Sequence, residues 1–318
     1  WIIMPECLTL GETMAAFAPD RTGPLRYVPN YSLRIAGAES NTAIGAAKLG
    51  VSAAWISRLG ADEFGQYIRN QIRAEGVDCS GVHFDPAHRT GVMFKQTGSG
   101  ESSVFYYREN SAASHMTPQD LDEALFRGCR ILHLSGITPV LSESCAETVQ
   151  AAIRLAQKYG ARVSFDPNIR QKLWNGRDYT PLLRQLTTRA EIVLMGLDEA
   201  EVLFGTRNVE QLCAGLFAVG HTEVAAFKDG SRGAWIADRN QCIRLEPYPC
   251  RCIDPIGAGD GFNAGVLAGL LQGRTLEQAG RMGAVCGALA TEVPGDVEGC
   301  PDAARMDAIL NGSSTIYR

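Results

Sequence analysis

A glycine cluster at residues 254–265 carries the residue types best suited to chemistry: DPIGAGDGFNAG runs directly into the apolar, helix-like segment VLAGLLQG. Gly257, Ala258 and Gly259 have little or no side chain, so a ligand can approach their backbone closely. The unpaired N–H groups of a first helical turn, with the positive end of the helix dipole, form a cradle for phosphate oxygens. Asp260 in the same turn could accept a proton from a hydroxyl. An amide cradle beside a base suits phosphoryl transfer to an alcohol.

The same residues have a simpler reading, in which Asp260 only stabilises the N-terminus of its own helix. Other glycine motifs are excluded. The chain has no Gly-Lys dipeptide and therefore no P-loop, and Phe262 stands where a dinucleotide fingerprint needs its third glycine. No G-x-S-x-G nucleophile elbow occurs either.

The composition is that of a globular protein, with 45% hydrophobic and 20% charged residues among 318. The net charge of −5 argues against nucleic acid as the main partner. Ten cysteines are scattered without a C-x-x-C pair, which favours reduced thiols. The start, WIIMPECLTL, resembles a first strand rather than a signal peptide, and the longest apolar segment is too short for a membrane span. We therefore expect a soluble, cytoplasmic protein without a membrane partner.

Short apolar runs alternate with amphipathic helical segments through much of the chain. AAWISRLG precedes DEFGQYIRNQIRAEG, RILHLSG precedes SESCAETVQAAIRLAQKYG, and AEIVLMG precedes LDEAEVLFG. Buried strands that alternate with helices indicate an α/β fold whose mostly parallel central sheet is covered on both faces. The glycine cluster then lies in front of a helix of this core.

Two segments interrupt that alternation. Residues 13–35 and 91–112 alternate polar and apolar positions and contain turn glycines but no helices, so we predict that they pair into a small antiparallel β lid. The core then consists of residues 1–12, 36–90 and 113–318. A lid with one free face also favours a homo-oligomer formed through the lid.

The glycine cluster closely resembles the C-terminal signature of the ribokinase-like (PfkB) sugar kinases, which usually reads D-T-x-G-A-G-D. A second family signature, G-G-x-x-x-N-x-A ending in L-G, corresponds to AGAESNTAIGAAKLG at residues 36–50, with Ala36 in place of the first glycine. The resemblance extends over nearly the whole chain. It implies a ribokinase-like three-layer sandwich that binds ATP with Mg²⁺.

The resemblance implies that Asp260 is the catalytic base and that the amides of 257–260 form an anion hole for the transferred phosphate. FKDGSRGAW matches the nucleotide-binding strand and turn of the family, which makes Lys228, Gly230 and Gly233 candidates near ATP. Without the family, Lys228 could equally be a surface lysine. RMGAVCGALA matches the segment that flanks adenine, although its Met and Cys could be packing residues.

Two positions depart from the family pattern. The N-x-x-E motif that orders Mg²⁺ and its waters begins with Gly196 here and keeps only Glu199, which would act on the metal through water. Many members bind a monovalent cation beside the anion hole. Asp254 is present for K⁺, but Pro255 replaces its usual hydroxylated neighbour.

The acceptor must be selected by other residues. Tyr106 and Arg108 are two apart in a predicted lid strand and share a face. Asn168 and Arg170 follow Asp166 past the carboxyl end of a predicted parallel strand, where open α/β sheets bind ligands, and Asn168 is expected on the cofactor side. Two converging arginines would suit an anionic acceptor. The alternative is that both are surface residues that never meet.

The segments AGAE, VFYYR and NIRQKLW together resemble one branch of the family, the 2-keto-3-deoxygluconate kinases. This resemblance implies that Gly37, Tyr106, Arg108 and Arg170 contact the sugar acid and that Asn41 faces its hydroxyls. The leading hypothesis is phosphorylation of the terminal primary hydroxyl to the 6-phosphate. The alternatives are a kinase for fructose or another neutral sugar and, from another class, a non-catalytic sugar-binding regulator. A dehydrogenase fails for lack of the fingerprint.

Overall fold

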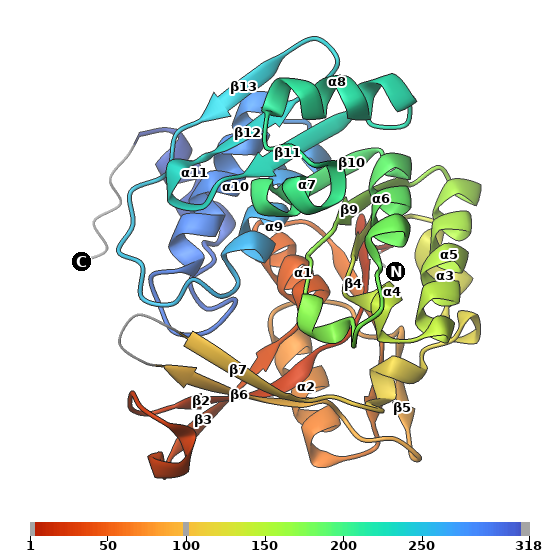
Figure 1. Ribbon diagram of the computed structural model, residues 1–318, viewed down its shortest axis with the longest axis vertical. Helices are drawn as coiled ribbons and strands as arrows, with labels where there is room; N and C mark the ends of the chain where they lie inside the picture. The colour runs from red at the N-terminus through yellow and green to blue at the C-terminus, as the bar shows by residue number, and fades with distance from the viewer. Residues whose placement is uncertain (1–3, 98–101, 313–318) are drawn as a thin grey trace.

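A nine-stranded sheet forms the centre of the computed structural model, which describes residues 4–97 and 102–312 (Figure 1). Residues 1–3 and 313–318 of the predicted core and residues 98–101 of the predicted lid lie outside this range. In spatial order the strands are β13 (Cys242–Leu245), β12 (Ala234–Ala237), β11 (Val224–Lys228), β10 (Ile192–Gly196), β9 (Arg162–Asp166), β8 (Ile131–Ser135), β1 (Cys7–Leu10), β4 (Ala53–Gly60) and β5 (Val82–Asp85).

Neighbouring strands from β11 to β5 are all parallel, and at one edge β12 pairs antiparallel with β11 and β13 pairs antiparallel with β12. The carboxyl ends of the parallel strands therefore meet at one edge of the sheet. β9 ends at Asp166, β10 at Gly196 and β11 at Lys228, which brings three predicted site segments side by side. Open α/β sheets bind ligands at this edge.

Helices cover both faces of the sheet, because successive strand residues point to opposite sides and both sets are apolar. Ile192 and Leu194 of β10 face one core, and Val193 and Met195 face the other. The first core includes residues of α1 (Ala38–Lys48), α2 (Glu63–Ala74), α9 (Ala258–Leu271), α10 (Leu276–Ala290) and α11 (Ala303–Leu310). The second includes residues of α3 (Glu123–Phe126), α4 (Thr138–Leu141), α5 (Glu143–Lys158), α6 (Thr180–Arg189), α7 (Leu197–Phe204) and α8 (Val209–Val219). The predicted three-layer α/β sandwich is confirmed.

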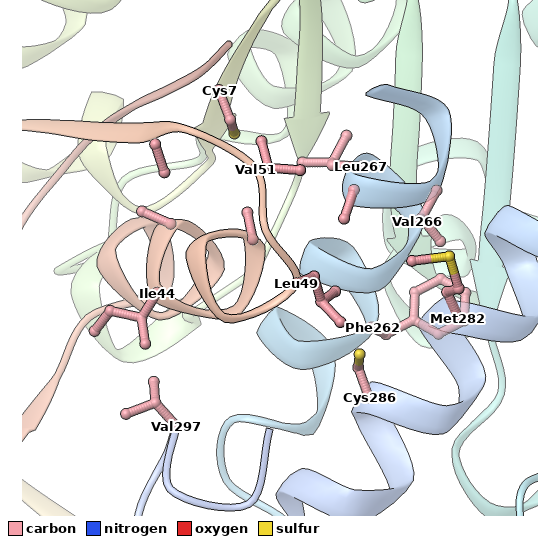
Figure 2. Packing of buried hydrophobic residues seen from close by; sticks show 14 of the residues in the cluster. Cys7, Ile44, Leu49, Val51, Phe262, Val266, Leu267, Met282, Cys286 and Val297 are labelled. Carbon is pink, nitrogen blue, oxygen red and sulfur yellow. The ribbon is translucent and has the colours of Figure 1, made fainter. Parts of the chain in front are cut away.

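Glycines in α9 let two helices pack very closely. A Cβ atom at Gly265 would lie 2.5 Å from the carbonyl oxygen of Met282, and one at Gly269 would lie 2.6 Å from Cα of Ala279. Figure 2 shows the apolar side chains at this contact, where Phe262 and Val266 of α9 lie beside Met282 of α10. The glycines of the cluster therefore divide into two groups. Those after Asp260 serve helix packing, and those before it remain for a ligand.

The lid is a separate four-stranded sheet with the order β3 (Tyr31–Ala36), β2 (Met14–Pro19), β6 (Val92–Thr97) and β7 (Ser102–Tyr107). Figure 1 shows these strands together, apart from the central sheet. Within each hairpin the pairing is antiparallel, but β2 and β6 pair in parallel, so the lid is mixed and not purely antiparallel as predicted. The reason is that β2 and β6 belong to different insertions and leave the core in the same direction.

Within the described residues, no helix combines the length and the apolar character needed for a membrane span. The cytoplasmic location stays a prediction.

Candidate active site

Two adjoining cavities meet at the N-terminus of α9. The larger, which we call the lid cavity, has a volume of about 780 Å³ and lies between the lid and the carboxyl ends of the parallel strands. The smaller, which we call the apolar cavity, has a volume of about 400 Å³ and lies between α10 and the β11–β12 turn. Lys228, Pro255 and Gly259 line both cavities. A group bound at Gly259 would therefore be reachable from both sides.

The first turn of α9 has the backbone geometry of an anion cradle. Gly257 precedes the helix with φ +84°, a left-handed conformation that side chains other than glycine rarely adopt. A Cβ atom there would also lie 2.5 Å from the carbonyl oxygen of Asp296. The amide of Ala258 makes only a long bond of 3.4 Å to Pro255, and the amides of Gly259 and Asp260 belong to the turn without intrahelical acceptors. These donors remain for a ligand.

Asp260 lies on the lid-cavity side of this turn. Its Oδ2 accepts a hydrogen bond of 2.8 Å from Nδ2 of Asn41 in α1, 219 residues away in sequence. Loss of water around the carboxyl group raises the pKa of Asp260 to about 7, and the neighbouring Asp166 and Asp296 add to the rise. Oδ1 of Asn41 has no partner among the described residues, so it remains as an acceptor for a hydroxyl.

Lys228 supplies a positive charge where the cavities meet. Its Nζ lies 2.8 Å from Oδ2 of Asp166 and 3.2 Å from Oδ1 of Asn263. Burial lowers the pKa of Lys228, but the carboxylates of Asp166 and Glu199 raise it, and the net shift is upward. The ammonium group therefore keeps its charge beside the cradle. It would lie 3.7 Å from a Cβ atom at Gly259.

Glu199 accepts hydrogen bonds from two backbone amides. Gly196 N donates to its Oε2 at 2.7 Å, and Ile169 N donates to its Oε1 at 2.8 Å. Burial raises the pKa of Glu199, with Asp166 as the next cause. Asn168 lines the lid cavity in a left-handed conformation with φ +38°. Both residues line the lid cavity together with Lys228, and their roles toward the cofactor stay predictions.

The acidic residues fit a magnesium ion that arrives with phosphates. In the described part of the chain, no three His, Cys, Asp or Glu side chains are grouped so that they could hold a metal ion. Mg²⁺ commonly keeps several waters and binds through one or two carboxylates plus substrate phosphates. Asp166 and Glu199 line the lid cavity and would hold such an ion through its waters and the phosphates.

The apolar cavity contains the predicted nucleotide segments. Gly230 and Gly233 line it from the turn after β11. Its other walls come from the chain before α9 and from α9 and α10, namely Tyr248, Phe262, Ala284, Gly287 and Ala288. A cavity with walls of small and apolar residues suits a planar base. The segment RMGAVCGALA therefore lines this cavity, and its place beside adenine stays a prediction.

Both predicted acceptor arginines line the lid cavity, together with Gly37 and Tyr106, but they differ in their surroundings. The Arg108 side chain is 9% exposed and forms an ion pair with the buried Glu12. Arg170 is exposed, and its guanidinium forms no ion pair with any described residue. The structure brings the two together, and only Arg170 has its charge unmatched.

Three site residues escaped the sequence reasoning: Lys95, Asp296 and Glu12. Lys95 of β6 lies on the inner face of the lid, where its Nζ is 2.8 Å from Oδ1 of Asp296 and 3.4 Å from Oδ2 of Asp254. The alternation in VMFKQ was a signal for Lys95, because it puts this lysine on the same face as the buried Met93. No local pattern marks Asp296 or Glu12. The predicted K⁺ at Asp254 stays a prediction, and the ammonium of Lys95 lies against that carboxylate.

Sequence relatives cover almost the whole chain. Residues 4–303 match the family model described as pfkB family carbohydrate kinase. A 2-dehydro-3-deoxygluconokinase of Bacillus subtilis (strain 168) is 33% identical over 317 residues, 98% of each chain. A 2-dehydro-3-deoxygalactonokinase of Haloferax volcanii is 30% identical over 295 residues, 92% of each chain. Fructokinase-2 of Solanum lycopersicum is 26% identical over 317 residues, 96% of each chain.

Solved structures share the fold. A PfkB protein from Polaromonas sp. JS666 is 36% identical with a TM-score of 0.87, over 96% of this chain and 99% of that one. A ribokinase II from E. coli, in complex with ATP and Mg²⁺, is 25% identical with a TM-score of 0.90, over 97% and 99%. A fructokinase double mutant from Vibrio cholerae O395, with fructose, ADP and potassium bound, is 27% identical with a TM-score of 0.85, over 96% and 98%.

Proposed function

Because the chain belongs to the pfkB family of carbohydrate kinases, we propose that it transfers a phosphoryl group from ATP to 2-keto-3-deoxygluconate, also called 2-dehydro-3-deoxygluconate. The acceptor is the terminal primary hydroxyl, and the product is the 6-phosphate. The observation that carries this proposal is the pair of cavities that share Lys228 and Gly259, with Asp260 facing the lid cavity. ATP would enter from the apolar cavity, and the sugar would bind under the lid.

In this mechanism Asp260 accepts the hydroxyl proton while the sugar oxygen attacks the γ-phosphorus and the bond to the ADP oxygen breaks. The amides of Gly259 and Asp260 and the ammonium of Lys228 stabilise the charge on the phosphoryl oxygens. Asn41 holds the Asp260 carboxylate in place. Mg²⁺ bound to the ATP phosphates would neutralise further charge, with Asp166 and Glu199 suited to hold it. The lid would exclude water, the competing acceptor.

The exposed Arg170 in the lining of the lid cavity favours a substrate with one carboxylate. Arg108 is neutralised in part by Glu12, so the two arginines contribute about one unmatched positive charge, from Arg170. A guanidinium group can bind a carboxylate through two parallel hydrogen bonds. Neutral sugars such as fructose need no such group. The fructokinase relatives nonetheless keep a neutral ketose as the second candidate, since both reactions use the same anion cradle and base.

A panel of acceptors separates these candidates through ADP release. The panel is 2-keto-3-deoxygluconate, 2-keto-3-deoxygalactonate, fructose, ribose and no acceptor. We expect the highest kcat/KM with a keto-deoxy sugar acid. Arg170→Ala should raise KM for that acid by about 10- to 100-fold, the loss of one or two charge-assisted hydrogen bonds, and leave fructose turnover unchanged.

The matched control is Arg177→Ala, which removes an exposed arginine seven residues along the same chain segment, outside the lining of either cavity. Arg108→Ala is a weaker test, because it also leaves the buried Glu12 without its partner and lowers stability. Equal kcat/KM for fructose and the sugar acid would argue for the ketose kinase. If none of the four sugars in the panel causes ADP release, both candidate kinase functions are contradicted.

The predicted homo-oligomer through the lid stays a proposal, supported by an aromatic outer face. Phe17 and Phe94 stack with ring centroids 4.8 Å apart, and Tyr107 at the end of β7 is 68% exposed. Sedimentation analysis should show that Tyr107→Lys shifts the protein toward monomer, while Val219→Lys, on the exposed surface of α8, does not. A monomeric wild type would contradict the proposal.

A further inference from the structure

Lys95 is a buried cation that the mechanism above does not use. It lies on the inner face of the lid strand β6, and only 4% of its surface is exposed. Its Nζ contacts two carboxylates of the core, Asp296 at 2.8 Å and Asp254 at 3.4 Å. These contacts join residues that are 201 and 159 positions apart in sequence. The lid is thereby connected to the segments on either side of the anion cradle.

The ammonium group keeps its charge in this position. Burial lowers the pKa of Lys95, but Asp296 and then Asp254 raise it, and the net shift is upward. Burying a single ammonium is costly, and two carboxylates around it offset that cost. Conversely, the buried carboxylate of Asp296 and the half-buried carboxylate of Asp254 would repel each other without a cation between them. One positive charge is therefore required at this point.

Both residues support the first turn of α9. Oδ1 of Asp254 accepts a hydrogen bond of 3.1 Å from Ile256 N, directly before Gly257. The backbone of Asp296 packs against Gly257, whose Cβ would lie 2.5 Å from the Asp296 carbonyl oxygen. Asp296 also accepts a bond of 3.3 Å from Asn41, the residue that holds Asp260. A cation between the two carboxylates thus acts on the cradle and on the base.

We propose that the ammonium of Lys95 is a built-in monovalent cation, which occupies the contacts that a free K⁺ would need at Asp254 and makes the reaction independent of added K⁺. Lys95 is a positioning residue, because it contacts the carboxylates that hold the cradle and not the reacting atoms. The inference rests on the proposed kinase activity. The proposed arrangement differs from the fructokinase structure with a bound potassium ion, because here the positive charge belongs to a lysine of the lid.

The test replaces Lys95 by methionine and compares KCl, NH₄Cl and choline chloride at equal ionic strength. For the wild type we expect the same kcat and the same Tm of the ligand-free protein in all three salts. Lys95→Met in choline should lose about 10²-fold in kcat, as expected when a cradle shifts by about 1 Å, with little change in the KM for ATP. K⁺ or NH₄⁺ should restore much of the kcat. These ions should also raise the Tm, because a cation that binds only the folded state stabilises it.

Two further variants keep the test decisive. Lys95→Met with Asp254→Asn removes the repulsion together with the cation, so it should fold without K⁺ and show no Tm response to it. Lys158→Met, at an exposed lysine of α5, should respond like the wild type. A wild type that needs K⁺ for turnover, or a Lys95→Met protein whose kcat and Tm respond to no cation, would overturn the proposal. Because the Tm measurements need no acceptor, they decide this inference even if the proposed sugar proves wrong.

Discussion

Asp260→Asn should lower kcat by about 10³-fold or more while leaving the KM of both substrates nearly unchanged, since a general base contributes about 10²- to 10⁴-fold. Asparagine has nearly the same shape and can still accept the hydrogen bond from Asn41, so the turn should remain intact. The variant tests the catalytic role directly against the simpler role of stabilising a helix N-terminus. Single-turnover measurements would separate the chemical step from binding.

The raised pKa of Asp260 leads to two further expectations, both for the pH dependence of the wild type. The wild-type kcat/KM should fall about tenfold per pH unit below pH 7, because only the ionised carboxylate accepts a proton and its pKa is about 7. Thermal stability should change in the opposite sense. The folded state keeps the proton up to about pH 7 and the unfolded state loses it near 3.8, so the wild type loses stability as the pH rises through that window.

The asparagine variant cannot titrate and should be more stable than the wild type above pH 7. The side chain is only half-buried, so we expect a gain of about 1–2 kcal/mol, less than the full shift would give. The gain should disappear near pH 4. Glu277→Gln is the matched control, because Glu277 is an exposed carboxylate in the first turn of α10. Near-normal kcat in Asp260→Asn would remove this residue from the role of base.

Lys228→Met is expected to lower kcat by about 10²- to 10³-fold, the usual effect of removing one preorganised donor from a site where charge develops. The same change leaves the buried Asp166 without its cation, which should lower the free energy of unfolding by about 3 kcal/mol. Loss of activity could then arise from either effect. Thermal unfolding and turnover must therefore be measured on the same preparations.

A double variant separates the two effects. Lys228→Met with Asp166→Asn removes the unpaired carboxylate, so the Tm should recover most of its loss because a neutral amide is less costly to bury than a charge. Turnover should stay low, because the phosphoryl group still lacks the ammonium. Recovery of both stability and turnover in the double variant would mean that Lys228 serves only to neutralise Asp166.

The sequence alone determined what depends on neighbouring residues. The alternation of apolar strands and amphipathic helices predicted the covered parallel sheet, and the strand ends at Asp166 and Lys228 follow from that order. Gly257 before the helix predicted a backbone cradle with Asp260 in its first turn. These features are local, because strand period, helix period and glycine conformation are set within a few residues.

Only the tertiary structure decided how charges from distant segments are matched. Lys95 meets Asp296 across 201 residues, and Arg108 of the second lid insertion meets Glu12, which belongs to the core segment before the first insertion. The parallel contact of β2 with β6 was also beyond local patterns, since nothing within either hairpin specifies which strand of the other hairpin it will pair with. The physical reason is that a buried charge is stabilised by whatever lies within a few ångströms of it, and that neighbour is chosen by the folding of the whole chain.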